Sequence, residues 1–194
     1  MNKFTYSLFP GDGDAYAFLV ASDGWLGKKI RFFMWLKNKL LKKDTKNLVN
    51  HADLFINDTI IGAVKEGIVS TSLAGMYDDG VKRKIYIYKI MASTSIKEKR
   101  KLYNWAISKV GTPYEISNIF NHIYRILYIW LKGKEKWIGH TGNHSNSRYF
   151  CSEFVTKAIN TTIPDFSLSA WDDDPMDLKE LCDKKLTFIK TINF

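Results

Sequence analysis

Long apolar segments are missing from this sequence. No uninterrupted apolar run reaches the ~18 residues of a membrane-spanning helix. The first residues, MNKFTYSLFPGDGDAY, lack the apolar centre of a signal peptide. We therefore expect a cytoplasmic protein with neither a targeting segment nor a transmembrane helix.

Cysteine and proline are also scarce. There are two cysteines, Cys151 and Cys182, and four prolines. Two cysteines do not make a disulfide framework, so we expect no disulfide partner for either. No Gly/Ser-rich linker, low-complexity tract or internal repeat divides the chain. We therefore expect residues 1–194 to form a single domain, with a core large enough to fold without cross-links.

Acidic residues are outnumbered by basic ones. The chain has 20 acidic and 29 basic residues, which gives a net charge of +9. Such an excess favours an anionic substrate or surface, either cell wall or membrane, and nucleic acid is the anionic partner that we expect least. The alternative is that the charge serves only to keep the protein in solution.

The spacing of apolar residues predicts an α+β fold in which helices pack on an antiparallel sheet. Alternating or short apolar runs, with turn pairs such as Asn57-Asp58 between them, predict strands at Ala15–Ala21, His51–Ile56, Thr59–Val64, Lys84–Met91 and Leu186–Ile192. Gly67–Leu73 is compatible with a further strand. Helical spacing predicts helices at Trp25–Lys43, Ser95–Val110 and Ile116–Leu131, one that begins at Cys151, and one that is capped by Asp172–Pro175.

The segment Trp25–Lys43 mixes apolar and basic residues. Ile30, Phe33 and Met34 recur at helical spacing with lysine and arginine between them. Such a helix either packs on the core or lies on an anionic membrane. Both interpretations remain open from the sequence.

The stretch that begins at Cys151 carries the candidate chemistry. Cys151, Phe154, Val155 and Ala158 are spaced as one face of a short helix. A cysteine in the first turn lies beside the helix N-terminus, where backbone amides favour the nucleophilic thiolate. The alternative is a buried cysteine that packs as a small apolar side chain.

A nucleophilic thiol needs a base to accept its proton. His51, on the predicted strand His51–Ile56, is the best partner, although a single histidine in a strand is more often structural. His140 and His144 lie four residues apart in a polar loop, but no third ligand accompanies them. We therefore expect a Cys151–His51 pair, no metal and no cofactor.

A set of short segments in this order resembles the circularly permuted NlpC/P60 superfamily, the permuted papain-fold hydrolases of the YiiX/YaeF type. In that family the histidine strand precedes the cysteine helix, as it does here. The matching segments are Trp25–Phe33, the strand at His51, Ile60–Ala63, Glu66–Ile68, Val110–Tyr114, Phe150–Val155, and Pro175 with Asp177 and Leu178. The resemblance spans roughly residues 14 to 180 and implies a permuted papain-like fold.

The resemblance also implies roles for individual residues. Cys151 would be the nucleophile and His51 the general base, and Tyr114 would lie near the cysteine as a substrate-binding residue. Family members usually carry a third polar residue on the strand after the histidine strand, where this chain has Gly62 or Ala63. Either another group such as Asp53 orients the imidazole, or the site is a dyad.

The function implied is that of a cysteine peptidase or amidase, a hydrolase that cleaves an amide bond in a peptidoglycan-type peptide or a related molecule. A lipid acylhydrolase or acyltransferase with the same site is one alternative, because the basic and aromatic helices would contact lipid. A catalytically degenerate, basic binding module is another.

Overall fold

The computed structural model describes residues 14–90, 95–115, 117–133, 148–167 and 174–194. Strands and helices alternate irregularly along these ranges, as expected for an α+β protein. In chain order they are β1 (Ala15–Ser22), α2 (Trp25–Leu40), β2 (His51–Ile56), β3 (Thr59–Val64), β4 (Gly67–Thr71), α3 (Leu73–Tyr77), β5 (Arg83–Lys89), α4 (Ile96–Ile107), α5 (Ser117–Lys132), α6 (Cys151–Asn160), α7 (Pro175–Lys185) and β6 (Thr187–Asn193).

The strands form a six-stranded sheet in the order β4-β3-β2-β1-β5-β6. Every neighbouring pair is antiparallel, so the predicted α+β fold with an antiparallel sheet is confirmed. The β2–β3 hairpin turns at Asn57 and Asp58, which both adopt positive φ, as the common two-residue hairpin turn requires. This hairpin fixes which residues of β3 lie opposite the histidine strand.

Strand β1 lies in the middle of the sheet and is buried on both faces. Its alternate residues enter two different apolar clusters, because successive side chains of a strand point to opposite faces. One face presents mostly alanines, such as Ala17, to the helices, whereas Tyr16 and Phe18 fill the other face. The small side chains allow a helix to pack closely on this part of the sheet.

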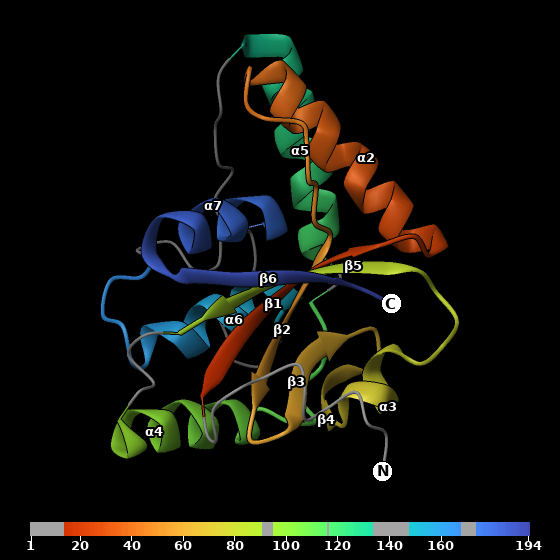
Figure 1. The fold of residues 1–194 in the computed structure, drawn as a ribbon. Coiled ribbons are helices and arrows are strands. Elements are labelled where there is room, and N and C mark those ends of the chain that lie inside the picture. The colour runs from red at the N-terminus through yellow and green to blue at the C-terminus, as the bar shows by residue number, and fades with distance from the viewer. Residues whose placement is uncertain (1–13, 91–94, 116, 134–147, 168–173) are drawn as a thin grey trace.

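Helices cover the two faces unequally. Helix α6 packs on β2 and β3, and α4 and α7 pack against α6, while α3 packs against β3 and belongs to the opposite cluster. Helices α2 and α5 lie side by side and project together from the sheet (Figure 1). No helix in the described part of the chain is long and apolar enough to cross a membrane.

A buried charge cluster joins the two projecting helices to α7. Lys37 of α2, which is 1% exposed, forms ion pairs with Asp174 and, at 3.0 Å, with Asp177. Arg125 of α5 pairs with Asp177 at 3.2 Å. Burial acts to lower the pKa of Lys37, but Asp174 and Asp177 raise it on balance. The cluster therefore holds α2 and α5 against the start of α7.

The predicted elements agree with the observed ones except at several ends. The helix expected to reach Lys43 ends at Leu40. The strand expected at Gly67–Leu73 ends at Thr71, because the Ser72 hydroxyl caps α3 by accepting a hydrogen bond from the Gly75 N–H at 3.0 Å. Helix α3 was not predicted. Met91, Ile116 and Asp172 lie outside the described residues.

Candidate active site

The candidate site lies at the end of the sheet where β1 ends and β2 begins. His51 is the first residue of β2 and lies opposite Val20 of β1. The preceding residue, Asn50, fixes this junction, since its side-chain oxygen accepts a hydrogen bond from the Ser22 N–H at 2.7 Å. His51 is therefore placed at the rim of the sheet, with its side chain 22% exposed.

Asp53 supplies a carboxylate to His51 from the same strand. Its Oδ1 lies 2.9 Å from His51 Nε2, but this atom makes no well-aligned hydrogen bond among the described residues, so the contact acts as an ion pair. The other oxygen, Oδ2, accepts a hydrogen bond from the Tyr77 hydroxyl at 2.6 Å. Asp53 is fully buried, and these two groups hold its carboxylate in place.

Gly62 makes room for this carboxylate. It is the residue of β3 directly opposite Asp53, and a Cβ at Gly62 would lie only 1.8 Å from Asp53 Oδ1. The absence of a polar side chain at this position therefore has a physical reason. The carboxylate that faces the imidazole comes from β2, and the glycine of β3 leaves it space.

Cys151 is the first residue of α6, at its N-terminus. Phe150 is the N-cap, and its side chain makes no capping hydrogen bond. The amides of the first turn favour negative charge at this end of the helix. The helix is buried on nearly all sides, not only along the predicted face, since Ser152, Glu153 and Thr156 are buried as well.

The thiol and the imidazole interact directly. Burial acts to lower the pKa of His51, but the charges of Asp53 and Cys151, together with a hydrogen bond between Cys151 and the ring, raise it well above its usual range. Since Nε2 faces Asp53, Nδ1 is the nitrogen left for the thiol. The arrangement favours a protonated imidazole between the Asp53 carboxylate and the Cys151 side chain.

Tyr114 reaches the same cysteine from a different segment. Burial, followed by the charge of Cys151 and a hydrogen bond to its side chain, raises the Tyr114 pKa well above its usual range, and the Cys151 backbone also hydrogen-bonds to the phenol. The segment is anchored at both ends. Thr112 accepts a hydrogen bond from the Ile68 N–H at 2.8 Å, and Tyr114 pairs with Tyr149 in an isolated β-bridge.

A cavity of about 570 Å³ opens beside these residues. His51, Tyr114 and Tyr77 line it, together with apolar side chains from the start of α2 and from the loop before β5. Cys151 is only 4% exposed and is not among the lining residues, whereas His51 and Tyr114, which both contact it, line the cavity. A substrate in this cavity would therefore meet His51 and Tyr114 as it approached the sulfur.

The structure thus brings together all three site residues that the sequence indicated, Cys151, His51 and Tyr114, and their catalytic roles stay predictions. Asp53 fills the place left open for an orienting group. Tyr77 was not foreseen, because it lies on the unpredicted helix α3. His140 and His144 lie outside the described residues, and within the described ranges no three His, Cys, Asp or Glu side chains cluster as a metal site would require.

Comparisons with known proteins add little to this geometry. No protein-family model matches the chain, and no curated protein matches it. The fold is similar to that of a solved structure, the crystal structure of the metalloprotein yiiX from Escherichia coli O157:H7, described as DUF1105. It shares 17% sequence identity, with 92% of this chain and 87% of that chain covered and a TM-score of 0.47. A similarity this distant assigns neither an activity nor a metal to the present chain.

Proposed function

We propose that this protein is a cysteine hydrolase that cleaves amide bonds on a permuted papain-like scaffold. The observation that supports this most is the row of side chains Cys151, His51 and Asp53. The imidazole contacts the thiol on one side and lies 2.9 Å from a buried carboxylate on the other. This is the nucleophile, base and orienting group that covalent catalysis requires.

In the proposed reaction the Cys151 thiolate attacks the substrate carbonyl carbon. The carbon–sulfur bond forms, and the carbonyl π electrons move to oxygen. As the tetrahedral intermediate collapses, His51 donates its proton to the leaving amine, and an acyl-thioester remains on Cys151. His51 then accepts a proton from water, and the resulting hydroxide attacks the thioester. Collapse breaks the carbon–sulfur bond, releases the carboxylic acid and leaves the Cys151 thiolate beside protonated His51, the state in which the reaction began.

The developing oxyanion has two donors within reach of Cys151. The first is the backbone N–H of Cys151 at the start of α6. The second is the Tyr114 hydroxyl, which hydrogen-bonds to both the backbone and the side chain of Cys151. A carbonyl oxygen that accepted the Cys151 N–H would lie beside this hydroxyl, and donors positioned in this way stabilise the transition state.

A peptidoglycan-type peptide or a related amide is the substrate class that we favour. The chain carries a net charge of +9, which suits an anionic polymer. Lys65 lines the cavity as well, whereas the charge of Arg83 there is balanced by Asp79.

The proposal predicts that an activated acyl substrate leaves its acyl group on Cys151. A p-nitrophenyl ester or a peptidoglycan-type peptide thioester should produce an adduct, which intact-mass and peptide mass spectrometry would locate. Cys151→Ala should abolish both the adduct and turnover, because the attacking atom is gone. Release of p-nitrophenol without any adduct on Cys151, and undiminished in Cys151→Ala, would contradict the proposal.

Tyr114→Phe separates the oxyanion role from general damage to the site. It removes one donor and should slow acylation by about 10²-fold. Alkylation of Cys151 by iodoacetamide, which forms no oxyanion, should change much less. Equal losses in the two reactions would assign Tyr114 a structural role only.

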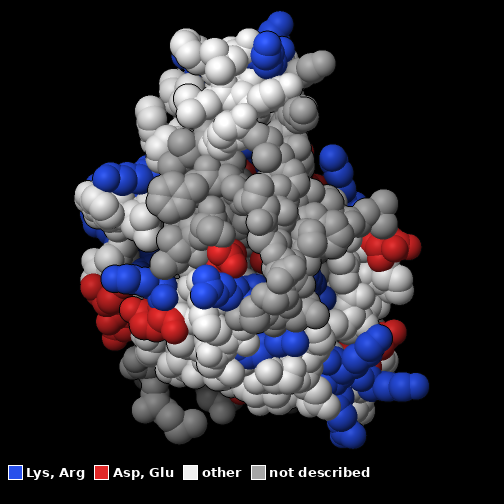
Figure 2. Space-filling view, turned by 180° about the vertical axis from the view of Figure 1, so that it is seen from behind, with Lys and Arg blue, Asp and Glu red and all other residues white. Residues whose placement is uncertain are grey.

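A lipid acylhydrolase or acyltransferase is a second candidate, favoured by apolar side chains left exposed on the projecting helices. Trp25 is 73% exposed and lines the cavity, and Trp130 of α5 is 68% exposed. Seen from behind, the projecting part is largely uncharged with basic side chains at its tip (Figure 2). Cosedimentation with anionic vesicles at low salt tests this candidate, and no binding counts against it.

A further inference from the structure

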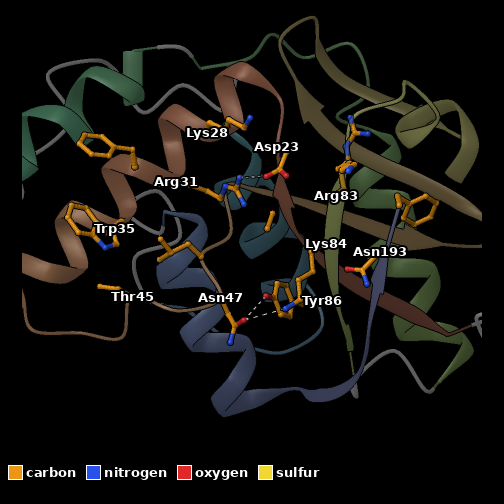
Figure 3. Close-up of a pocket in the computed structure, with 15 residues that line it drawn as sticks. Asp23, Lys28, Arg31, Trp35, Thr45, Asn47, Arg83, Lys84, Tyr86 and Asn193 are labelled. Atoms are coloured by element: carbon orange, nitrogen blue, oxygen red, sulfur yellow. Dashed lines mark hydrogen bonds and ion pairs between the residues drawn. The ribbon is translucent and has the colours of Figure 1, made fainter.

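A second cavity, of about 730 Å³, lies on the helix-covered side of the sheet and away from Cys151. It is bounded by α2, by the first residues of β5, and by the loop between α2 and β2 (Figure 3). Alternate residues at the end of β1 face the two cavities. Ala21 and Asp23 line this one, whereas Val20 and Ser22 line the candidate active site.

Five basic side chains line this second cavity: Lys28, Arg31, Lys82, Arg83 and Lys84. Two of them are already neutralised, because Arg31 pairs with Asp23 and Arg83 pairs with Asp79. Within the described ranges, the remaining three lysines form no ion pair, and the Lys84 ammonium group interacts with two neutral groups, the Asn47 side chain and the Tyr86 ring. The cavity therefore keeps three uncompensated positive charges.

The walls of the cavity combine this charge with flat apolar surface. Phe32 and Trp35 of α2 both line it and stack on each other, with ring centroids 6.0 Å apart. Opposite them, the Tyr86 hydroxyl donates a hydrogen bond to Asn47 Oδ1 at 3.0 Å (Figure 3). The Trp35 ring also carries the Lys39 ammonium group above it, whereas Phe32 is 55% exposed, so Phe32 presents the more open ring. Cationic groups beside such a ring are suited to bind a phosphate and to stack a planar ring.

We propose that this cavity binds a small phosphate-bearing ligand with a planar ring, of the nucleotide class. Its volume falls within the range of small-molecule sites, ~300–1,000 Å³. A concave site between a helix and a sheet favours a small ligand over a membrane, since a flat surface cannot reach Tyr86, which is buried. The proposal does not depend on catalysis by Cys151.

Calorimetric titration with ADP and with inorganic pyrophosphate tests the proposal. Both should bind at low salt and more weakly as salt is added, because charge attraction is screened. The triple variant Lys28→Gln/Lys82→Gln/Lys84→Gln should weaken both by at least about tenfold, which is the sum expected for three partly exposed charge contacts. Phe32→Ala should weaken ADP more than pyrophosphate, because pyrophosphate has no ring to stack.

A matched control removes three exposed lysines elsewhere: Lys97→Gln/Lys101→Gln/Lys184→Gln lowers the net charge equally. Its affinities should stay close to those of the unmodified protein, and thermal melting should show that both triple variants are folded. Equal weakening in the two triple variants, or no binding of either ligand, would overturn the proposal. Vesicle binding that needed Lys28, Lys82 and Lys84 without any ADP or pyrophosphate binding would also overturn it.

Discussion

Asp53→Asn is expected to slow acylation of Cys151 by as much as ~10⁴-fold, the loss that the equivalent change causes in a Ser-His-Asp triad. The carboxylate is one of the charges that raise the His51 pKa. An amide in its place removes that charge and can donate to Nε2, which would leave the proton of the neutral ring on Nδ1, facing the thiol. Initial rates with a p-nitrophenyl ester measure the effect.

Asp79→Asn is the matched control for this change. Asp79 also lines the active-site cavity, but it pairs with Arg83 rather than with the imidazole. It should retain most of the acylation rate. Asp53 also accepts a hydrogen bond from the Tyr77 hydroxyl, so the substitution could disturb the fold as well. Thermal melting must therefore show that Asp53→Asn is folded. A folded Asp53→Asn variant with the original rate would show that Asp53 does not orient His51.

Lys37→Met is expected to lower the free energy of unfolding by ~3–5 kcal/mol, the range for breaking a buried ion pair by removing one partner. Methionine fills a similar volume, so the loss comes mainly from the carboxylates of Asp174 and Asp177, which would keep Arg125 but lose their most buried cation. Urea unfolding of the variant and the unmodified protein at pH 7.5 measures the difference.

Lys43→Met is the control for Lys37→Met, and the pH dependence of the loss in unfolding free energy gives a second test of the buried cluster. Lys43 also approaches Asp177, at 3.9 Å, but it is 34% exposed, so Lys43→Met should cost less than ~1 kcal/mol. Burial, followed by the charge of Asp174, raises the Asp177 pKa, and loss of Lys37 would raise it further. The deficit of Lys37→Met should therefore shrink as pH falls through this raised pKa. Equal deficits in the two lysine variants would contradict a buried, energetically coupled cluster.

The sequence predicted the sheet well, because the strands carry strong local signals. The turn pair at Asn57-Asp58 and the apolar runs on either side of it suffice to define the β2–β3 hairpin. Helix α3 has only five residues, too few to show a helical period, so the sequence did not reveal it. Tyr77, which holds the carboxylate of Asp53, was missed for the same reason.

The orienting carboxylate shows where sequence reasoning reaches its limit. The alternation of a strand places His51 and Asp53 on one face, so Asp53 could be considered from the sequence. The predicted hairpin places Gly62 opposite Asp53, but only the structure shows that the glycine leaves space for Asp53 Oδ1. The charge cluster of Lys37 with Asp174 and Asp177 joins residues more than 130 positions apart, and no local pattern indicates such a pairing.

The pH profile of Cys151 alkylation, in the unmodified protein and in His51→Ala, tests the central claim that His51 holds Cys151 as a thiolate. Peptide mass spectrometry would follow iodoacetamide labelling between pH 5 and 9, with the fully buried Cys182 as an internal reference. We predict that Cys151 still reacts rapidly at pH 6 in the unmodified protein, far ahead of Cys182. In His51→Ala most of that reactivity at pH 6 should be lost, because the imidazolium that stabilises the thiolate is gone. Superimposable profiles of the two proteins would contradict the account.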